Sequence, residues 1–128
     1  MKYWRFMDYY SEAGNDLIEE WYLDQNPEVR ADFDVTLRNL AGSRDWHGLN
    51  EFKMLRGKQS GFGEIRFKTR NIQYRPVGRF GPGIREFTLL VGCYKKQRVY
   101  EPPDAFDVAV RRWTLYKQGR ATIRERSI

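Results

Sequence analysis

The residues with the clearest potential for chemistry lie in one segment, GEIRFKTRNIQYRPVGRF, which spans positions 63–80. Four arginines and one lysine occupy its polar positions: Arg66, Lys68, Arg70, Arg75 and Arg79. Apolar residues stand between them at the spacing of strands that pack on one side. So many cations in two successive strand-like stretches favour a polyanionic partner. A solvated, charged sheet face is the alternative interpretation of the same pattern.

The charge of the whole chain supports the same partner class. The 128 residues contain 23 Lys and Arg against 17 Asp and Glu, a formal net charge of +6. Hydrophobic residues make up 41%, which predicts a folded chain, and this length suits one domain, residues 1–128, with one core. An anionic membrane surface would also satisfy the charge, but no segment approaches the roughly 18 apolar residues of a spanning helix.

Several classes of site are excluded by residue counts. Cys93 is the only cysteine, which excludes an internal disulfide and a multi-cysteine zinc site, and His47 is the only histidine. The segment MKYWRFMDYYSEAG has no continuous apolar stretch typical of a signal peptide. We therefore expect a cytoplasmic protein without metal or cofactor.

The first half of the sequence predicts a strand followed by two helices. Residues 2–10 are aromatic and read as a strand, with Ser11 as the N-cap of a helix. Asn26 and Pro27 end that helix and begin the next one, which Gly42 stops. The helical apolar positions are Leu17, Ile18, Trp21 and Tyr22, and then Val29, Phe33, Leu37 and Leu40.

The second half predicts three strands and a helix. The strand candidates cover residues 64–68, 72–79 and 86–94, with an irregular stretch at 43–60 before them. Pro76 indicates an edge position or a bulge. A terminal helix should follow Asp104, and the tail from residue 119 should be loosely held. The fold class is α+β, in the order β-α-α-β-β-β-α.

Alternation along the strands predicts where the charges point. Arg66 should lie opposite Ile65 on the sheet, and Arg75 and Arg79 should share its face unless a bulge intervenes. The apolar face of the terminal helix, formed by Phe106, Val110 and Trp113, should then pack on the sheet face opposite this basic patch.

Ordered motifs over residues 53–96 resemble the RelE/ParE toxin superfamily, and most closely its HigB-like, phage-derived branch. The matching features are Leu55-Arg56-Gly57 before the sheet, the run GEIRFK, the pair Tyr74-Arg75, and an apolar strand that ends in GCYKK. The resemblance implies a RelE-like small curved antiparallel sheet packed against two N-terminal helices and a C-terminal helix.

RelE- and HigB-like members are metal-independent endoribonucleases that cut messenger RNA, usually in the decoding site of the ribosome. The 2′-hydroxyl of the RNA attacks the adjacent phosphate, which leaves a cyclic phosphate and a free 5′-hydroxyl. This reaction needs a proton acceptor, a proton donor, and cations for the charge that builds on phosphorus. Arginine suits the last task because its fork binds two phosphate oxygens.

By resemblance, four residues form the predicted catalytic set: Glu64, Arg66, Arg75 and Tyr94. Arg75 is the phosphate-binding arginine, and Tyr94 falls where members carry a catalytic tyrosine, histidine or arginine. Glu64 acts as a base or pairs with the two arginines, and Glu51 resembles a base used in another branch. The predicted RNA-binding residues are Lys53, Arg56, Lys58, Lys68, Arg79, Lys95 and Lys96.

Three further residues have expected roles of their own. Cys93 alternates away from Tyr94 and should be a small core residue. Trp46 stands in a predicted loop and is the best candidate among the tryptophans for stacking on a nucleobase. His47 does not match the late-strand histidine of some family members, so we expect no catalytic role for it.

Three functions are compatible with this sequence. The resemblance favours the toxin of a type II toxin–antitoxin pair, with messenger RNA, the ribosome and a separately encoded antitoxin as partners. A ParE-like toxin that inhibits DNA gyrase without nuclease activity is the alternative. An inactive RNA-binding phage remnant is the third.

Overall fold

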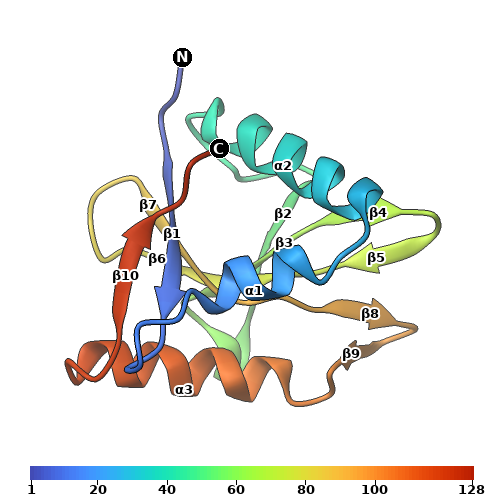
Figure 1. Cartoon of the computed structure of the whole chain (residues 1–128). Helices are drawn as coiled ribbons and strands as arrows, with labels where there is room; N and C mark the ends of the chain where they lie inside the picture. Colours follow the sequence, from blue (N-terminus) through green and yellow to red (C-terminus); the bar gives the residue numbers. More distant parts are fainter.

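Two β-sheets meet along a line of bends in the chain, and three helices pack around them (Figure 1). The computed structural model describes residues 1–128. The large sheet has the order β10 (Thr122–Glu125), β1 (Arg5–Tyr10), β7 (Glu86–Val91), β6 (Val77–Phe80), β3 (Phe62–Ile65) and β2 (Phe52–Met54). The small sheet has the order β4 (Phe67–Thr69), β5 (Ile72–Tyr74), β8 (Tyr94–Lys96) and β9 (Val99–Glu101). The helices are α1 (Leu17–Leu23), α2 (Pro27–Ala41) and α3 (Ala105–Lys117), and a short 3₁₀ turn, η1, covers Gly57–Gln59.

Each of the three strands expected in the second half runs through both sheets and breaks between them. The chain leaves the large sheet at Arg66, passes back into it at Arg75-Pro76, and leaves it again at Gly92-Cys93. Pro76 has no N–H for a sheet hydrogen bond, although its carbonyl accepts one from Ile65 N at 2.8 Å. At Gly92 the Trp21 ring occupies the space that a side chain would need. At Pro76, where the sequence indicated an edge position or a bulge, the structure thus has one of three aligned breaks.

The pairing of the terminal strands differs from the expected antiparallel sheet. The first strand, β1, runs parallel to β7 and antiparallel to β10. The tail that was expected to be loosely held therefore closes one edge of the large sheet as β10. The opposite edge is β2, which lies in the stretch expected to be irregular. The class α+β is confirmed, but the large sheet is mixed while the small one is antiparallel, and the expected order lacked β2, β9, β10 and the breaks between strands.

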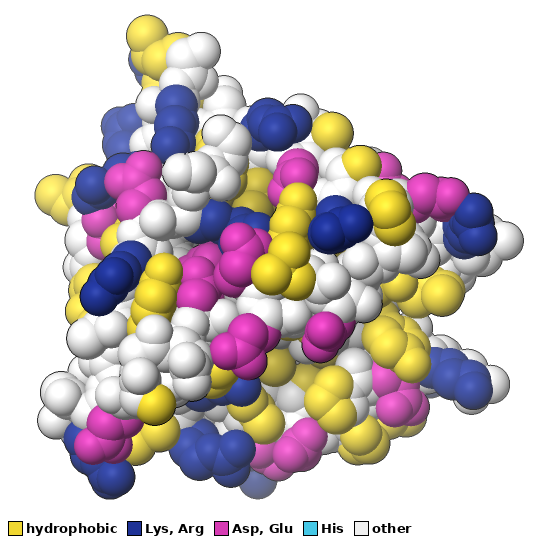
Figure 2. Space-filling model, viewed as in Figure 1, with side chains coloured by type: hydrophobic (Ala, Val, Ile, Leu, Met, Phe, Trp, Pro, Cys, Tyr) yellow, Lys and Arg dark blue, Asp and Glu magenta, His cyan; other side chains and the backbone are white.

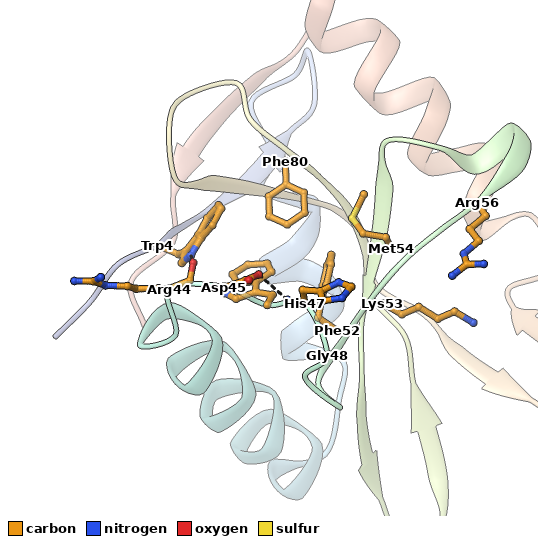
Figure 3. Close-up of a pocket in the computed structure, with 11 residues that line it drawn as sticks. Trp4, Arg44, Asp45, His47, Gly48, Phe52, Lys53, Met54, Arg56 and Phe80 are labelled. Atoms are coloured by element: carbon orange, nitrogen blue, oxygen red, sulfur yellow. Dashed lines mark hydrogen bonds between the residues drawn. The ribbon is translucent and has the colours of Figure 1, made fainter.

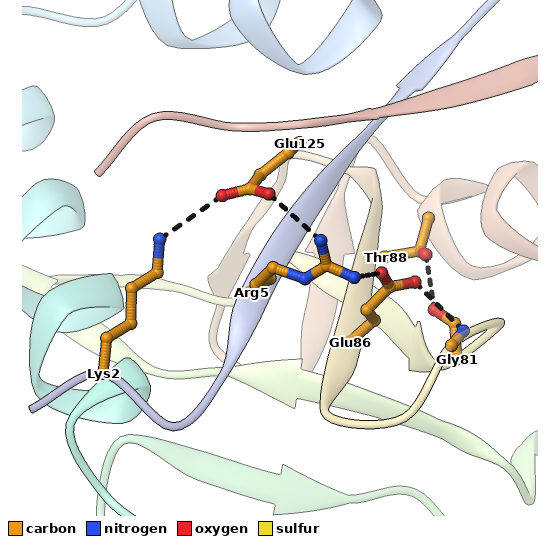
Figure 4. Close-up of polar contacts among 7 residues, drawn as sticks. Lys2, Arg5, Gly81, Glu86, Thr88 and Glu125 are labelled. Atoms are coloured by element: carbon orange, nitrogen blue, oxygen red, sulfur yellow. Dashed lines mark hydrogen bonds and ion pairs between the residues drawn. The ribbon is translucent and has the colours of Figure 1, made fainter.

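Polar contacts attach β10 to the rest of the sheet (Figure 4). Arg5 on β1 pairs with Glu125 on β10 at 3.4 Å and also with Glu86 on β7. Beyond β10, the Arg126 side chain is buried and pairs with Asp8 at 2.8 Å and with Glu19 at 3.3 Å. Since an unpaired charge inside a protein is costly, these carboxylates determine where the C-terminal segment docks.

The two N-terminal helices begin at residues whose side chains accept hydrogen bonds from free backbone N–H groups. Pro27 is the first residue of α2 and Gly42 follows its last turn, as predicted. Asn26 caps this helix by accepting from Val29 N at 3.1 Å. Helix α1 instead begins after Asp16, which caps it in place of Ser11. None of the three helices combines the length and the hydropathy of a segment that crosses a bilayer.

The helices cover opposite faces of the large sheet, with α2 and α3 far apart in Figure 1. Phe33, Leu37 and Leu40 of α2 pack with the buried side chains of one sheet face. Helix α3 buries Ala105, Ala109 and Trp113 on the other face.

The expected placement of α3 is wrong in two respects. Val110 is exposed rather than packed, because the buried side chains of the helix are Ala105, Ala109 and Trp113. The face that α3 covers is also the face of Phe62 and Glu64, which alternate along β3 with residues of the α2 face. Helix α3 therefore packs on the same face of the large sheet as Glu64, and not on the opposite face as expected.

Removal of the buried Arg126 charge provides a test of this docking. Burial raises the pKa of Asp8 to about 8, so the test is made at pH 9, where the carboxyl is ionised. There Arg126→Ala should lower the free energy of unfolding by about 3–5 kcal/mol, because it removes the cation paired with the buried Asp8. Arg124→Ala, at an exposed position of β10, is the control and should change the stability by less than about 0.5 kcal/mol. Equal, small losses in urea titrations of both variants would mean that the C-terminal segment contributes little to the fold.

Candidate active site at the bend of the sheets

A buried carboxylate lies where the two sheets meet. Glu64 on β3 is 1% exposed, and both of its oxygens accept hydrogen bonds. Oε1 accepts from Arg66 Nε at 3.1 Å and forms an ion pair with Arg66 Nη2 at 3.0 Å, and Oε2 accepts from the Tyr100 hydroxyl at 2.6 Å. Arg75 Nε lies 3.8 Å from Oε1. These four residues, the Glu64 cluster, place a proton acceptor, a phenol and two guanidinium groups together.

The breaks between strands bring these side chains together. Arg66 occupies the break between β3 and β4, and Arg75 occupies the break between β5 and β6. The Arg75 backbone is held by Cys93, whose carbonyl accepts from Arg75 N at 2.9 Å. The Arg75 guanidinium donates to Tyr74 O at 2.9 Å and to Gln73 Oε1 at 2.7 Å. The cluster is therefore held in place before any ligand arrives.

Burial and neighbouring charges shift the proton affinities within the cluster. Burial, followed by repulsion from the adjacent Arg66 guanidinium, lowers the pKa of Arg75 below its usual value. The pKa of Tyr100 is raised, first by burial and then by the hydrogen bond to Glu64 and the charge of that carboxylate. Tyr100 therefore keeps its proton at neutral pH and can act as a donor.

The cluster opens into a groove of about 750 Å³ between β2, η1 and the β8–β9 hairpin. Glu64 is the only carboxylate on its wall, and four cations line it: Lys53, Arg56, Lys95 and Arg98. Lys95 Nζ also lies 4.8 Å from the centre of the Tyr100 ring. With this charge balance the groove suits an anionic ligand whose reacting group lies near Glu64.

On the other side of the two arginines lies a smaller pocket of about 270 Å³. Arg66 and Arg75 share its wall with Glu51, Lys68 and Gln73. Of the cations at positions 63–80, Arg66, Lys68 and Arg75 line this small pocket and none lines the groove, whose cations come from other parts of the chain. The face that carries α1 and α2 mixes acidic, basic and apolar side chains and shows no comparable concentration of cations (Figure 2).

The structure does not bring the predicted catalytic Tyr94 to the cluster. Tyr94 pairs with Tyr74 across β8 and β5, with ring centres 6.0 Å apart, and Tyr74 in turn stacks on Phe67 in the core below α2. Neighbouring residues of a strand face opposite ways, so Lys95 points to the Glu64 side and Tyr94 away from it. The tyrosine of the cluster is Tyr100.

Sequence reasoning missed Tyr100 because it ended the strand at Tyr94 and placed no hairpin after it. In the structure the chain turns at Gln97, with φ of +60°, and Lys95 pairs with Tyr100 across β8 and β9. Residues 94–101, YKKQRVYE, contain the polar turn between two short strand-like runs that such a hairpin requires. That signal could have identified Tyr100.

The other predicted RNA-binding residues are spread over several places. Lys53, Arg56 and Lys95 line the groove, and Lys68 lines the small pocket. Lys58 and Lys96 are exposed and line neither cavity. Arg79 lies over the rings of Phe62, at 4.9 Å, and Trp113, at 5.5 Å, so its guanidinium packs against α3 instead of joining Arg75.

Cys93 and Trp46 are buried in the structure, and His47 is exposed. Cys93 is buried, as predicted, and burial raises the pKa of its thiol to about 12. The expectation that Trp46 is an open stacking residue is wrong: its ring is 3% exposed, and its indole N–H donates to Leu40 O at 2.7 Å. His47, next in the chain, is exposed and lies outside the Glu64 cluster.

Comparison of the chain with protein-family models, with curated proteins and with solved structures finds no match. No group of three or more His, Cys, Asp or Glu side chains is arranged to hold a metal ion. A functional assignment therefore depends on the chemistry of the Glu64 cluster and its groove.

Two tyrosine-to-phenylalanine variants test the cluster. Tyr100→Phe removes the phenolic donor to the buried Glu64 and should cost about 1.5–3 kcal/mol of unfolding free energy at pH 7. Tyr94→Phe, on the neighbouring strand, removes an exposed hydroxyl that makes no hydrogen bond, and should cost less than about 0.5 kcal/mol. Chemical denaturation of both variants supplies the comparison.

The advantage of Tyr100 over phenylalanine should also disappear in alkali. Because the folded-state pKa is raised, the stabilisation is fully present below the unfolded-state pKa of about 10. As the pH rises further, the unfolded chain ionises first, and the difference should shrink by about 1.4 kcal/mol per pH unit. A difference that stays constant to pH 11 would contradict the buried hydrogen bond.

Proposed function

We propose that the protein is an endoribonuclease that cleaves messenger RNA through attack of a 2′-hydroxyl on the adjacent phosphate. The observation that carries this proposal is the pairing of one carboxylate with one protonated phenol in a groove lined by cations. That reaction needs an acceptor, a donor and positive charge at the phosphate, and the groove offers each of them.

In this mechanism Glu64 takes the proton of the 2′-hydroxyl. The 2′-oxygen forms a bond to phosphorus, and the bond from phosphorus to the 5′-oxygen breaks. Tyr100 gives its proton to the departing 5′-oxygen. The hydrogen bond of 2.6 Å between Tyr100 and Glu64 then lets the carboxyl return a proton to the phenolate, which restores both groups. The products are a 2′,3′-cyclic phosphate and a 5′-hydroxyl.

The cations on both sides of Glu64 stabilise the charge that develops on phosphorus. Arg66 and Arg75 approach from the small pocket, and Lys53 and Lys95 approach from the groove. The rigid hold on Arg75 means that little reorganisation is needed as the charge grows. Its fork can also bind two phosphate oxygens at once, which a lysine cannot do.

The resemblance to HigB-like toxins supplies the biological setting of the proposal. The messenger is then cut on the ribosome, and a separately encoded antitoxin holds the toxin inactive. A groove with four cations and a single carboxylate suits an acidic antitoxin segment as well as RNA. Binding of that partner should weaken as salt rises, because charge pairs across the groove contribute to it.

The role of the buried carboxylate is tested by Glu64→Gln, which keeps the shape of the side chain but cannot take a proton at the same atom. Messenger cleavage on programmed ribosomes should slow by on the order of 10²- to 10⁴-fold. Glu51→Gln, in the neighbouring small pocket, should keep nearly the full rate. The reverse ranking would make Glu51 the base and contradict the proposed mechanism.

The role of Arg75 is separable from general electrostatics. Arg75→Ala should reduce turnover by on the order of 10²- to 10³-fold and weaken RNA binding much less, because the guanidinium acts on the developing charge. Arg75→Lys should recover only part of the rate. Arg70→Ala, which removes an exposed arginine paired with Glu28, is the control and should leave turnover unchanged. Equal, small effects at Arg70 and Arg75 would remove the support for a specific phosphate contact.

A further inference from the structure

A second cavity, of about 470 Å³, lies on the other side of the edge strand β2 (Figure 3). We call it the aromatic pocket, after the four rings in its wall: Trp4, Trp46, Phe52 and Phe80. Its volume falls within the range of small-molecule sites, which combine apolar walls with a few polar groups. The nuclease mechanism proposed for Glu64 makes no use of it.

The rings of the aromatic pocket are fixed in place. The centres of Trp4 and Trp46 are 4.8 Å apart, and those of Trp4 and Phe80 are 5.3 Å apart. Both indole N–H groups are already engaged, by the carbonyls of Arg44 at 3.1 Å and Leu40 at 2.7 Å. The pocket thus offers ring faces to a ligand and does not need its indole N–H groups for recognition.

The aromatic pocket and the groove share one border. Lys53, Met54 and Arg56 line both cavities. Phe52 and Lys53 are neighbours on β2 and therefore face opposite sides of the sheet. Lys53 pairs directly with Glu64 on β3, and adjacent strands lie about 4.8 Å apart. An extended ligand that starts at Glu64 and crosses the edge strand β2 at Lys53 therefore reaches the aromatic pocket.

The charges along this path separate a phosphate position from a base position. Lys53 and Arg56 extend to one side of the rings in Figure 3, toward the shared border. Inside the pocket, Asp45 accepts from His47 N at 2.9 Å and presents a carboxylate. Arg44, the third cation of the wall, packs over the Tyr3 ring at 5.2 Å. The carboxylate beside the rings therefore disfavours a phosphate at that position, whereas an uncharged aromatic ring would stack on Trp4 and Phe80.

We infer that the aromatic pocket binds a nucleobase of the single-stranded RNA whose scissile phosphate lies over Glu64. The RNA backbone crosses the edge strand β2, where Lys53 and Arg56 contact its phosphates, and a neighbouring base enters the pocket. This inference rests on the proposed nuclease function and adds a positioning subsite to it. Aromatic stacking holds bases of every type, so the subsite positions the strand without requiring one sequence.

The tryptophan indoles of the protein provide a direct measurement. In ¹⁵N-labelled protein, the N–H signals of Trp4 and Trp46 report on the pocket, while those of Trp21 and Trp113, elsewhere in the fold, are internal controls. The probe is a deoxytrinucleotide, which cannot be cleaved, compared with a trinucleotide of the same backbone that has no bases. The normal probe should shift the Trp4 and Trp46 signals selectively, and the abasic probe should not.

Two results would overturn the inference. Equal shifts with the normal and abasic probes would show that only phosphates bind, and no shift of Trp4 or Trp46 would leave the pocket to another occupant, such as an apolar side chain of a protein partner. Since the probe cannot react, a failure of base binding is independent of cleavage. If the protein cuts RNA but its Trp4 and Trp46 signals do not shift, the base subsite is wrong and the proposed function stands. If the signals shift with the normal probe alone but RNA is not cut, the pocket binds a base and the proposed nuclease function is wrong.

A substitution gives the second test. Trp4→Leu keeps an apolar side chain but removes the stacking surface, and should weaken binding of the normal probe by on the order of 10-fold. Its affinity for the abasic probe should not change. Phe106→Leu, a half-buried aromatic position on α3, is the matched control and should bind both probes as the unmodified protein does. Unchanged affinity of a folded Trp4→Leu variant for the normal probe would contradict the subsite.

Discussion

The buried charge of Glu64 is the constraint on which the rest of the site depends. A carboxylate that is 1% exposed is tolerated only when other groups replace the water that it has lost. Its partners come from three different parts of the chain: Arg66 directly after β3, Arg75 between β5 and β6, and Tyr100 on β9. Straight strands would carry these side chains past one another, and the aligned breaks let them converge. The bend of the sheets and the chemistry of the cluster are thus two aspects of one arrangement.

The positive charge of residues 63–80 is divided among tasks of different kinds. Arg66 and Arg75 surround the carboxylate, and Lys68 lines the small pocket beside them. Arg70 forms a surface pair with Glu28, and Arg79 packs over two rings next to α3. Only part of this charge is therefore available to an anionic ligand. The groove takes all four of its cations from outside this segment: Lys53 on β2, Arg56 just before η1, and Lys95 and Arg98 in the β8–β9 hairpin.

Local sequence signals predicted the ends of α2 well, whereas the pairing of strands distant in the sequence was not predicted. Asn26-Pro27 and Gly42 placed the ends of α2, and Pro76 marked a break, because each acts through its own backbone geometry. The parallel pairing of β1 with β7 and the docking of β10 depend on contacts such as Arg126 with Asp8, which no local pattern reveals. The resemblance placed Arg66 and Arg75 in one site with Glu64, and the structure brings these three residues together. It brings Tyr100 and not Tyr94 to Glu64, through a hairpin that was not anticipated. Trp46 was predicted to be open because it stands in a loop, yet that loop folds onto the aromatic core.

The central claim is that the 2′-hydroxyl of the RNA is the nucleophile at the Glu64 cluster. The most direct measurement is cleavage of a messenger on programmed ribosomes, with the same messenger carrying a single 2′-deoxynucleotide immediately before the scissile phosphate. We expect the unmodified messenger to give a 2′,3′-cyclic phosphate and a 5′-hydroxyl, and the deoxy substitution to abolish that cut alone. Cleavage that persists at the deoxy position, or products that end in a 3′-hydroxyl and a 5′-phosphate, would contradict the account.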